Sequence, residues 1–153
     1  MPDLIGQTLL NRYHVDARIG SGGMSEVYRA FDQQRQITVA LKFLREDLAE
    51  DPEFERRFRK EANALQRLTH PGIVRFYELD RTERMLFLVM DYVDGSTLRG
   101  HLFDLQGPLP PGEALAILTP IAAALNYAHA QGVLHRDIKP GNITCWLKMG
   151  VRY

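Results

Sequence analysis

The first third of the chain alternates apolar and polar residues with a period of two, and this pattern most constrains the fold. In YHVDARI the side chains of Tyr13, Val15, Ala17 and Ile19 occupy every second position, the period of a strand with one buried face. SEVYRAFD and ITVALKFL are further strand patterns, and the second is rich in β-branched residues. Because only short turns separate the three patterns, the sequence predicts an antiparallel meander.

A helix is predicted next, in DPEFERRFRKEANALQRL. Asp51 is expected to cap this helix, and Pro52 suits its first position. Glu61 borders the apolar stripe of this helix. Most glutamates at such a position are solvated at the surface and have no buried partner. Lys42 and Ala40 share a strand face, and a lysine among apolar neighbours is unfavourable unless a carboxylate or ligand meets it. Two such charges predict an ion pair between Lys42 and Glu61.

Two further strands and a helical region complete the predicted elements. HPGIVRFYELD and ERMLFLVMDYV have strand character, and a polar turn joins them, which gives five strands in all. EALAILTPIAAALNYAHAQG is predicted to form a helix that ends at Gly132, with a kink at Pro120. This helix is apolar on nearly every side, which is typical of a helix inside a larger helical domain. The fold class is therefore α+β.

Composition excludes several functional classes. Nineteen basic and nineteen acidic residues cancel, so no net field favours nucleic acid or an anionic membrane. We find no apolar run long enough to span a bilayer and no cationic start typical of a signal peptide. The single cysteine, Cys145, cannot form an internal disulfide and fits a reducing compartment. We therefore expect a cytoplasmic protein with no membrane segment in this chain.

A glycine-rich turn, IGSGGMSEV, lies between the first two predicted strands. Gly20 and Gly22 fit the first two positions of a G-x-G-x-x-G pattern, and Ser25 takes the third. Backbone amides in such a turn can close over phosphates, although glycine-rich hairpins without a ligand are at least as common. The strand–turn–strand setting argues against a dinucleotide-binding unit. No G-x-x-x-x-G-K-[ST] sequence occurs, which excludes a Walker-type loop.

The segment HRDIKPGN is more specific. Asp137, Lys139 and Asn142 bring a carboxylate, an ammonium group and an amide oxygen into one short loop. Such groups can accept a hydroxyl proton, neutralise a phosphate and bind a magnesium ion. A solvated charged turn is the alternative. The loop follows the apolar helix and a predicted short strand, VLH, which favours residues presented on a rigid support.

These motifs resemble those of the eukaryotic-type protein kinases, specifically the bacterial serine/threonine kinases. The matching segments, in the family's order, are IGSGGMSEV, VALK, the helix, HPGIV, LVMDYV and HRDIKPGN. The resemblance covers residues from about Leu9 to Ile143. It implies a kinase-like fold with a five-stranded antiparallel N-lobe and its αC helix in residues 1–90. A hinge at 91–95 and the start of a helical C-lobe at 96–153, truncated after the catalytic loop, would follow.

The resemblance also implies a role for each matching residue. The glycine-rich loop over ATP would be Ile19, Gly20, Ser21, Gly22, Gly23, Met24, Ser25, Glu26 and Val27, with Val27 and Ala40 covering adenine. Lys42 would bind the α- and β-phosphates and Glu61 would pair with it. Met90 would be the gatekeeper, followed by the hinge residues Asp91, Tyr92 and Val93. Asp137 would be the catalytic base, Lys139 would stabilise the transferred phosphoryl group and Asn142 would hold Mg²⁺. Arg136 before Asp137 resembles kinases regulated by activation-loop phosphorylation.

The sequence departs from the family pattern after Ile143. The family continues with a strand, D-F-G, an activation loop and A-P-E, and none of these follows here. TCWLKMG fits the expected strand poorly. Read from the third base of the Thr144 codon, the same bases can encode Leu-Leu-Ala-Glu-Asp-Gly, a plausible strand and turn. We therefore expect a local frameshift or sequencing error followed by premature termination, and weak or no catalysis by this chain alone.

Several functions follow as hypotheses. The first is an ATP- and Mg²⁺-dependent kinase that phosphorylates serine or threonine in a protein substrate, represented by its amino-terminal half. The second is a non-catalytic ATP-binding module, and the third is an inert fragment. A small-molecule kinase of related fold is a weaker rival, because KPGN after HRD favours the protein-kinase loop by analogy.

Overall fold

A computed structural model describes residues 4–21, 25–44, 51–83, 85–105, 107–146 and 150–152, without the side chains of residues 57, 61, 146 and 150–152. The chain divides into two compact units. The sheet unit comprises residues 1–67 and 75–92, and the helical unit comprises residues 68–74 and 93–153.

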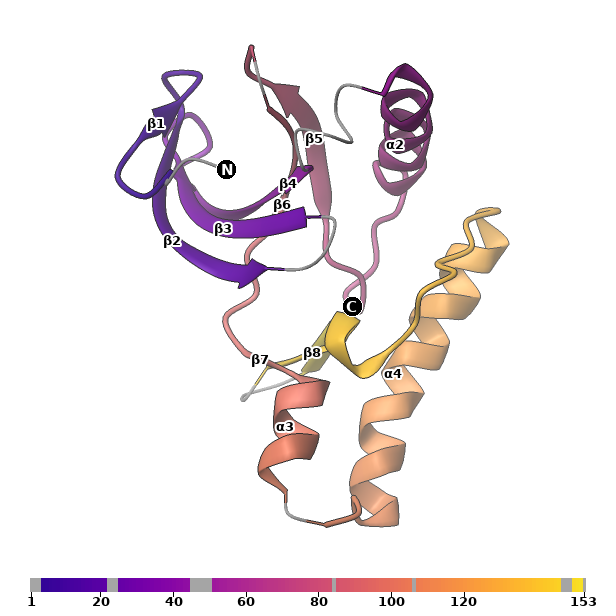
Figure 1. The fold of residues 1–153 in the computed structure, drawn as a ribbon. Coiled ribbons are helices and arrows are strands. Elements are labelled where there is room, and N and C mark those ends of the chain that lie inside the picture. The colour runs from indigo at the N-terminus through magenta and orange to yellow at the C-terminus, as the bar shows by residue number, and fades with distance from the viewer. Residues whose placement is uncertain are drawn as a thin grey trace. The chain divides into compact units, whose positions relative to one another are not determined.

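The sheet unit contains a curled antiparallel sheet with the strand order β1-β2-β3-β4-β6-β5 (Figure 1). The strands are β1 (Thr8–Leu9), β2 (Tyr13–Ser21), β3 (Ser25–Asp32), β4 (Ile37–Leu44), β5 (Phe76–Arg81) and β6 (Leu86–Asp91). The five predicted strands are confirmed, and the two-residue β1 adds a sixth at one edge. Strand β5 begins at Phe76, later than predicted, because residues 70–73 form a turn in which the Ile73 amide donates to the His70 carbonyl.

The alternation that predicted the strands separates the two faces of the sheet. Val39, Leu41 and Phe43 of β4 are completely buried in the main core, and the rings of Phe43 and Phe87 pack with centroids 4.9 Å apart. Ala40 and Lys42 point to the opposite face, because successive side chains of a strand alternate. On that face Leu88 and Met90 pack with residues of the helix that follows β4 in the chain. One face therefore forms the core and the other carries Lys42.

Helix α2 (Pro52–Leu65) begins as predicted. The Asp51 carboxylate accepts hydrogen bonds from the backbone amides of Glu53 and Phe54, at 2.9 and 3.4 Å. These bonds satisfy two of the donors that a helix start leaves open. Ala62 is buried against Phe76 and Leu88, so the helix packs on the sheet through its apolar stripe.

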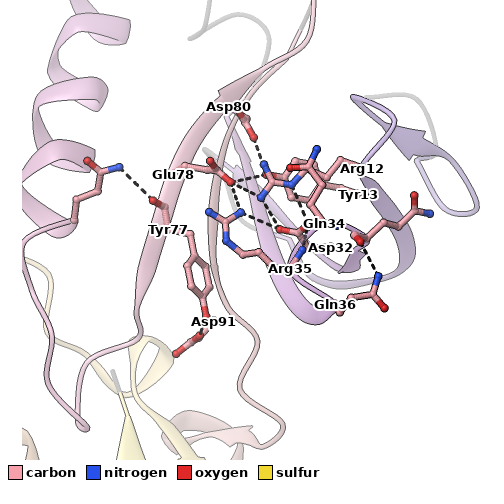
Figure 2. A network of polar contacts seen from close by, with 12 residues as sticks. Arg12, Tyr13, Asp32, Gln34, Arg35, Gln36, Tyr77, Glu78, Asp80 and Asp91 are labelled. Carbon is pink, nitrogen blue, oxygen red and sulfur yellow. Dashed lines mark hydrogen bonds and ion pairs between the residues drawn. The ribbon is translucent and has the colours of Figure 1, made fainter.

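A buried polar network joins β2 to β5, two strands that are not neighbours in the sheet (Figure 2). The Asp32 side chain is 0% exposed and accepts from Arg12 Nε at 2.9 Å and Nη2 at 2.7 Å, and from Arg35 Nη1 at 3.0 Å. Both arginines also contact Glu78, at 2.7 and 2.5 Å. The hydroxyl of buried Tyr13 lies 2.8 Å from Glu78 and 2.7 Å from an Asp80 oxygen. The network therefore closes the curled sheet.

The helical unit contains two helices, a short 3-10 turn and a small sheet. These elements are α3 (Leu98–Asp104), α4 (Pro111–Ala130), η1 (Pro140–Asn142), and the antiparallel strands β7 (Ser96–Thr97), β8 (Thr144–Trp146) and β9 (Gly150–Arg152). Their core consists of Leu98, Ile117, Ile121 and Ile143. Within the parts of the chain that the structure describes, no helix combines the length and apolar character needed to cross a bilayer.

In the helical unit some predictions are confirmed and others are wrong. Gly132 has φ +74°, as the predicted end of α4 requires, and the helix continues through Pro120. The predicted strand VLH is wrong, because residues 133–135 are irregular. The expectation that TCWLKMG fits a strand poorly is wrong for its first three residues, which form β8. Residues 147–149 lie outside the described part. Leu115 and Leu118 of α4 are 65% and 55% exposed, so this unit buries only part of that helix.

Candidate functional site

The strand register brings four predicted site residues to one face of the sheet. Val27 lies opposite Lys42, and Ala40 lies opposite Met90. Since Ala40 and Lys42 are two residues apart on β4, all four side chains share the face opposite the main core. Ala40 is 6% exposed and Lys42 is half-buried. This face therefore offers a small apolar surface with the Lys42 cation at its side.

The glycine-rich segment connects β2 to β3. Ile19, Gly20 and Ser21 end β2, whereas Ser25, Glu26 and Val27 begin β3. Gly20 pairs with Val27 and Ser21 pairs with Glu26, so the two strands stay paired up to the turn. Gly22, Gly23 and Met24, which were predicted to form the turn itself, lie outside the described residues. The strand–turn–strand setting is confirmed on both sides of the turn.

The predicted partner of Lys42 belongs to helix α2. Residue 61 lies within Pro52–Leu65, but the side chain of Glu61 is outside the described part of the structure. The ion pair between Lys42 and Glu61 therefore stays a prediction.

The segment after Met90, the predicted gatekeeper, is held by Arg75 and by β5. The Asp91 amide donates to the Arg75 carbonyl at 2.9 Å, and the Tyr77 hydroxyl donates to Asp91 Oδ1 at 2.6 Å. The Tyr92 ring lies 5.9 Å from the Arg29 guanidinium carbon. Sequence reasoning missed the contacts with Arg75 and Tyr77. The adjacent aromatics Phe76 and Tyr77, which break the strand alternation, are the one local signal.

The loop HRDIKPGN brings its three predicted site residues together. Lys139 Nζ lies 2.8 Å from Asp137 Oδ2. Asn142 Nδ2 donates to Asp137 Oδ2 and to the Asp137 carbonyl, both at 2.9 Å. Asp137 and Lys139 remain 60% and 47% exposed. Carboxylate, ammonium and amide groups thus form one cluster that an incoming molecule can reach.

The neighbours of Asp137 keep it ionised. The hydrogen bond from Lys139 is the main cause that lowers the pKa of this carboxyl below its usual value, and the hydrogen bond from Asn142 adds to it. Both bonds favour the charged form because both donors meet an anionic oxygen. At neutral pH the loop therefore presents a carboxylate that can accept a proton or a hydrogen bond.

The loop is anchored by the core of the helical unit. The backbone N–H of Asn142 donates to the Lys139 carbonyl at 2.8 Å within η1. The backbone N–H of Leu98 donates to the Ile143 carbonyl at 2.7 Å. Ile143 is 4% exposed and packs with Leu98. Arg136 has φ +63°. This backbone conformation is uncommon outside glycine and is frequent at functional sites. Helix α3, rather than the predicted VLH strand, supports the loop.

Asn142 is the one predicted metal ligand in the chain. Its amide nitrogen donates to Asp137, so this bond does not use the amide oxygen. Amide and carboxylate oxygens suit a hard cation such as Mg²⁺. Among the residues that the structure describes, no group of three or more histidine, cysteine or acidic side chains could hold a metal. Asn142 would supply one such oxygen to a magnesium ion.

Comparison with known proteins gives one consistent family. The protein kinase domain model matches residues 13–150. Serine/threonine-protein kinase PrkC of Bacillus subtilis is 46% identical over 140 residues, which are 92% of this chain and 22% of the relative. Serine/threonine-protein kinase PknB of Mycobacterium leprae is 45% identical over 139 residues, 88% of this chain and 22% of the relative. The chain thus spans about a fifth of the length of these curated relatives.

Solved structures give the same result. The crystal structure of the PknI kinase domain of Mycobacterium tuberculosis matches with a TM-score of 0.80 and 40% identity, covering 91% of this chain and 56% of that one. A mutant form of that domain matches with a TM-score of 0.83 and 39% identity over 94% of this chain and 58% of that one. The curled antiparallel sheet with its helix, and the start of a helical part, are the shared features.

Proposed function

Since the chain belongs to the protein kinase family, we propose that it forms the amino-terminal part of the catalytic domain of a serine/threonine protein kinase. Such an enzyme transfers the γ-phosphate of ATP to a serine or threonine hydroxyl of a protein. The observation that carries the proposal is the cluster of Asp137, Lys139 and Asn142. It places an ionised acceptor, a cation and an amide group in one accessible loop.

Each loop residue has a role that its geometry permits. The Asp137 carboxylate would accept the proton of the substrate hydroxyl, because its lowered pKa keeps it unprotonated at neutral pH. Lys139 would neutralise charge on the transferred phosphoryl group. The amide oxygen of Asn142 would hold Mg²⁺, which neutralises phosphate charge when bound.

The sheet unit would bind the nucleotide. We propose that the glycine-rich segment 19–27 covers the phosphates, that Val27 and Ala40 cover the adenine ring, and that Lys42 binds the phosphates with Glu61 as its partner. The shared sheet face of Val27, Ala40, Lys42 and Met90 supports this assignment. Residues 91–93 would meet the adenine edge, and the lobes would comprise residues 1–90 and 96–153. A cytoplasmic location, inferred from cysteine usage, belongs to the same proposal.

Nucleotide-dependent stabilisation tests the sheet unit. Binding to the folded state adds about 2.7 kcal/mol at a ligand concentration of one hundred times Kd, so MgATP should raise the melting temperature of the chain. Lys42→Met should abolish this increase, because it removes the predicted phosphate ligand. Lys60→Met is the matched control, since Lys60 is exposed on α2 and has no assigned role. The absence of any nucleotide-dependent shift in the unmodified chain would refute the proposal.

Phosphate transfer separates the kinase from a non-catalytic ATP-binding module. Radiolabelled ATP and a mixed serine/threonine peptide substrate would be incubated with the chain and with Asp137→Asn. Transfer that is lost in Asp137→Asn supports the catalytic assignment. Stabilisation by MgATP without any transfer favours the binding module for this chain.

A further inference from the structure

Tyr77 occupies a special place in β5. In the register of β5 with β6, Phe76 pairs with Met90 and Glu78 pairs with Val89, so the register shifts at Tyr77. Such a β-bulge leaves one residue outside the regular ladder and redirects its side chain, and bulges are common next to active sites. Here the redirected side chain reaches Asp91, as Figure 2 shows. The bulge therefore has a specific structural consequence at the end of β6.

Two bonds from this region fix Asp91. Its carboxylate accepts from the Tyr77 hydroxyl at 2.6 Å, and its backbone amide donates to the Arg75 carbonyl at 2.9 Å. With the side chain and the amide both held, the peptide plane that ends at the Asp91 amide is fixed, and so is the direction in which the Cα–C bond leaves Asp91. A hydrogen bond to a charged acceptor is also stronger than one between neutral groups. The orientation of the Asp91 backbone thus depends on Tyr77.

Tyr77 is itself held from several sides. The guanidinium carbons of Arg35 and Arg75 lie 5.2 and 5.3 Å from the centre of its ring, a distance at which a cation is attracted to an aromatic face. Gln66 Nε2, at the end of α2, donates to the Tyr77 carbonyl at 3.2 Å. Arg35 is in turn bonded to Asp32 and Glu78. The ring is therefore attached to the buried network that closes the sheet.

We propose that Tyr77 is a positioning residue for adenine recognition. It orients the Asp91 backbone so that the segment after β6 presents its polar groups to the adenine edge. The inference rests on the proposed function, in which residues 91–93 meet adenine. It adds a residue outside the matched motifs, and it assigns the β5 bulge a role in nucleotide affinity.

The test compares two ligands that use different parts of the site. ADP carries adenine, whereas inorganic tripolyphosphate carries only phosphates. Tyr77→Phe should weaken ADP binding by about five- to twentyfold, because only part of the free energy of a hydrogen bond to a charged group is lost from binding when the bond is already present in the free chain. Tripolyphosphate, measured by displacement of ADP, should bind within about twofold of the unmodified chain because its predicted contacts do not involve Asp91.

Tyr13→Phe is the matched control. It makes the same chemical change in the same network, but Tyr13 bonds Glu78 and Asp80 and not Asp91. Because Tyr13 is completely buried, this control should lower the melting temperature more than Tyr77→Phe while leaving ADP affinity unchanged. Equal losses of ADP affinity in the two variants would overturn the proposal, because the effect would then be general destabilisation.

A double-mutant cycle with Asp91→Ala decides the mechanism. If Tyr77 acts through Asp91, the double variant should bind ADP no more weakly than the weaker single variant. If the fold-losses of ADP affinity in the two single variants multiply in the double variant, the inference is contradicted. Unchanged ADP affinity in Tyr77→Phe would contradict it as well. If the unmodified chain fails to bind ADP at all, the proposed function fails first and this inference fails with it.

Discussion

The two units place aspartates in opposite environments. Asp32 of the sheet unit is 0% exposed and accepts hydrogen bonds from two arginines and from the backbone amides of Gln34 and Arg35. Asp137 of the helical unit is 60% exposed and is bonded by Lys139 and Asn142. Both carboxylates have cationic and neutral donors. Burial, and not the type of partner, is what distinguishes them.

This difference distinguishes a carboxylate that stabilises the fold from one that is available to a substrate. A buried charge depends on its partners, because an unpaired charge in the interior is very unfavourable. An exposed ion pair contributes little to folding and can exchange its partners for solvent or a ligand at small cost. Asp32 is therefore suited to holding the sheet closed, and Asp137 to meeting a substrate. Substitutions at three aspartates or at their partners test this view.

The largest effect is expected at Asp32. Asp32→Ala leaves the guanidinium groups of Arg12 and Arg35 without their shared buried partner and should reduce the free energy of unfolding by about 3–5 kcal/mol. Urea denaturation followed by circular dichroism measures the change. Asp16→Ala is the control, because Asp16 is exposed and lies 3.6 Å from Arg29. This variant should change the value by less than about 0.5 kcal/mol. Similar losses in the two variants would remove the distinction between buried and exposed carboxylates.

A smaller effect is expected at Asp51, which is exposed but caps α2. Asp51→Ala removes the acceptor for the Glu53 and Phe54 amides and should cost about 1 kcal/mol of stability, whereas Asp51→Asn should retain most of it. Asp104→Ala at the other end of a helix, α3, is the matched control and should be neutral or slightly stabilising, because a negative charge is unfavourable there. Thermal unfolding of the three variants checks the order. A loss in Asp51→Asn equal to that in Asp51→Ala would show that charge, and not capping, is responsible.

The sequence predicted most of the fold because its signals are local. Alternation identified β2, β3 and β4, and the Asp51-Pro52 start identified α2. The buried network could not be predicted in this way. Arg12 and Asp32 are 20 residues apart, and Tyr13 and Glu78 are 65 apart, so only the closed sheet brings them together. Local patterns also failed for VLH, whose apolar residues lie in an irregular segment.

The candidate site likewise contains residues that the local sequence predicts and contacts that only the folded chain creates. Asp137, Lys139 and Asn142 lie within six consecutive residues, so a short loop is enough to bring them together, as predicted. Spacing alone placed Lys42 and Ala40 on one face, and sheet register added Val27 and Met90 to it. The contact between Tyr77 and Asp91 depends on a bulge, whose only sequence signal is a pair of adjacent aromatics. Such a contact requires the structure.

The smallest effect concerns the acidity of Asp137. Lys139→Ala should raise the pKa of the Asp137 carboxyl towards its usual value of about 3.9, because the Lys139 hydrogen bond is the main cause of the lowered pKa. Asn142→Ala should raise the pKa less, since its bond is the secondary cause. Carboxyl carbon chemical shifts, followed by NMR during an acid titration, measure both changes. A larger increase in Asn142→Ala than in Lys139→Ala would contradict the assigned order of the two donors.

The same titration fixes the sign of the effect on stability. A pKa that is lower in the folded chain than in the unfolded chain stabilises the fold at every pH above the unfolded value. That contribution is lost as the pH falls through the folded pKa, below about pH 4. Because Asp137 is exposed, the loss should be much smaller than the loss caused by Asp32→Ala, and removal of Lys139 should leave neutral-pH stability nearly unchanged. A strong destabilisation of Lys139→Ala at neutral pH would mean that the exposed loop, like the buried network, holds the fold together, and the contrast between the two aspartates would fail.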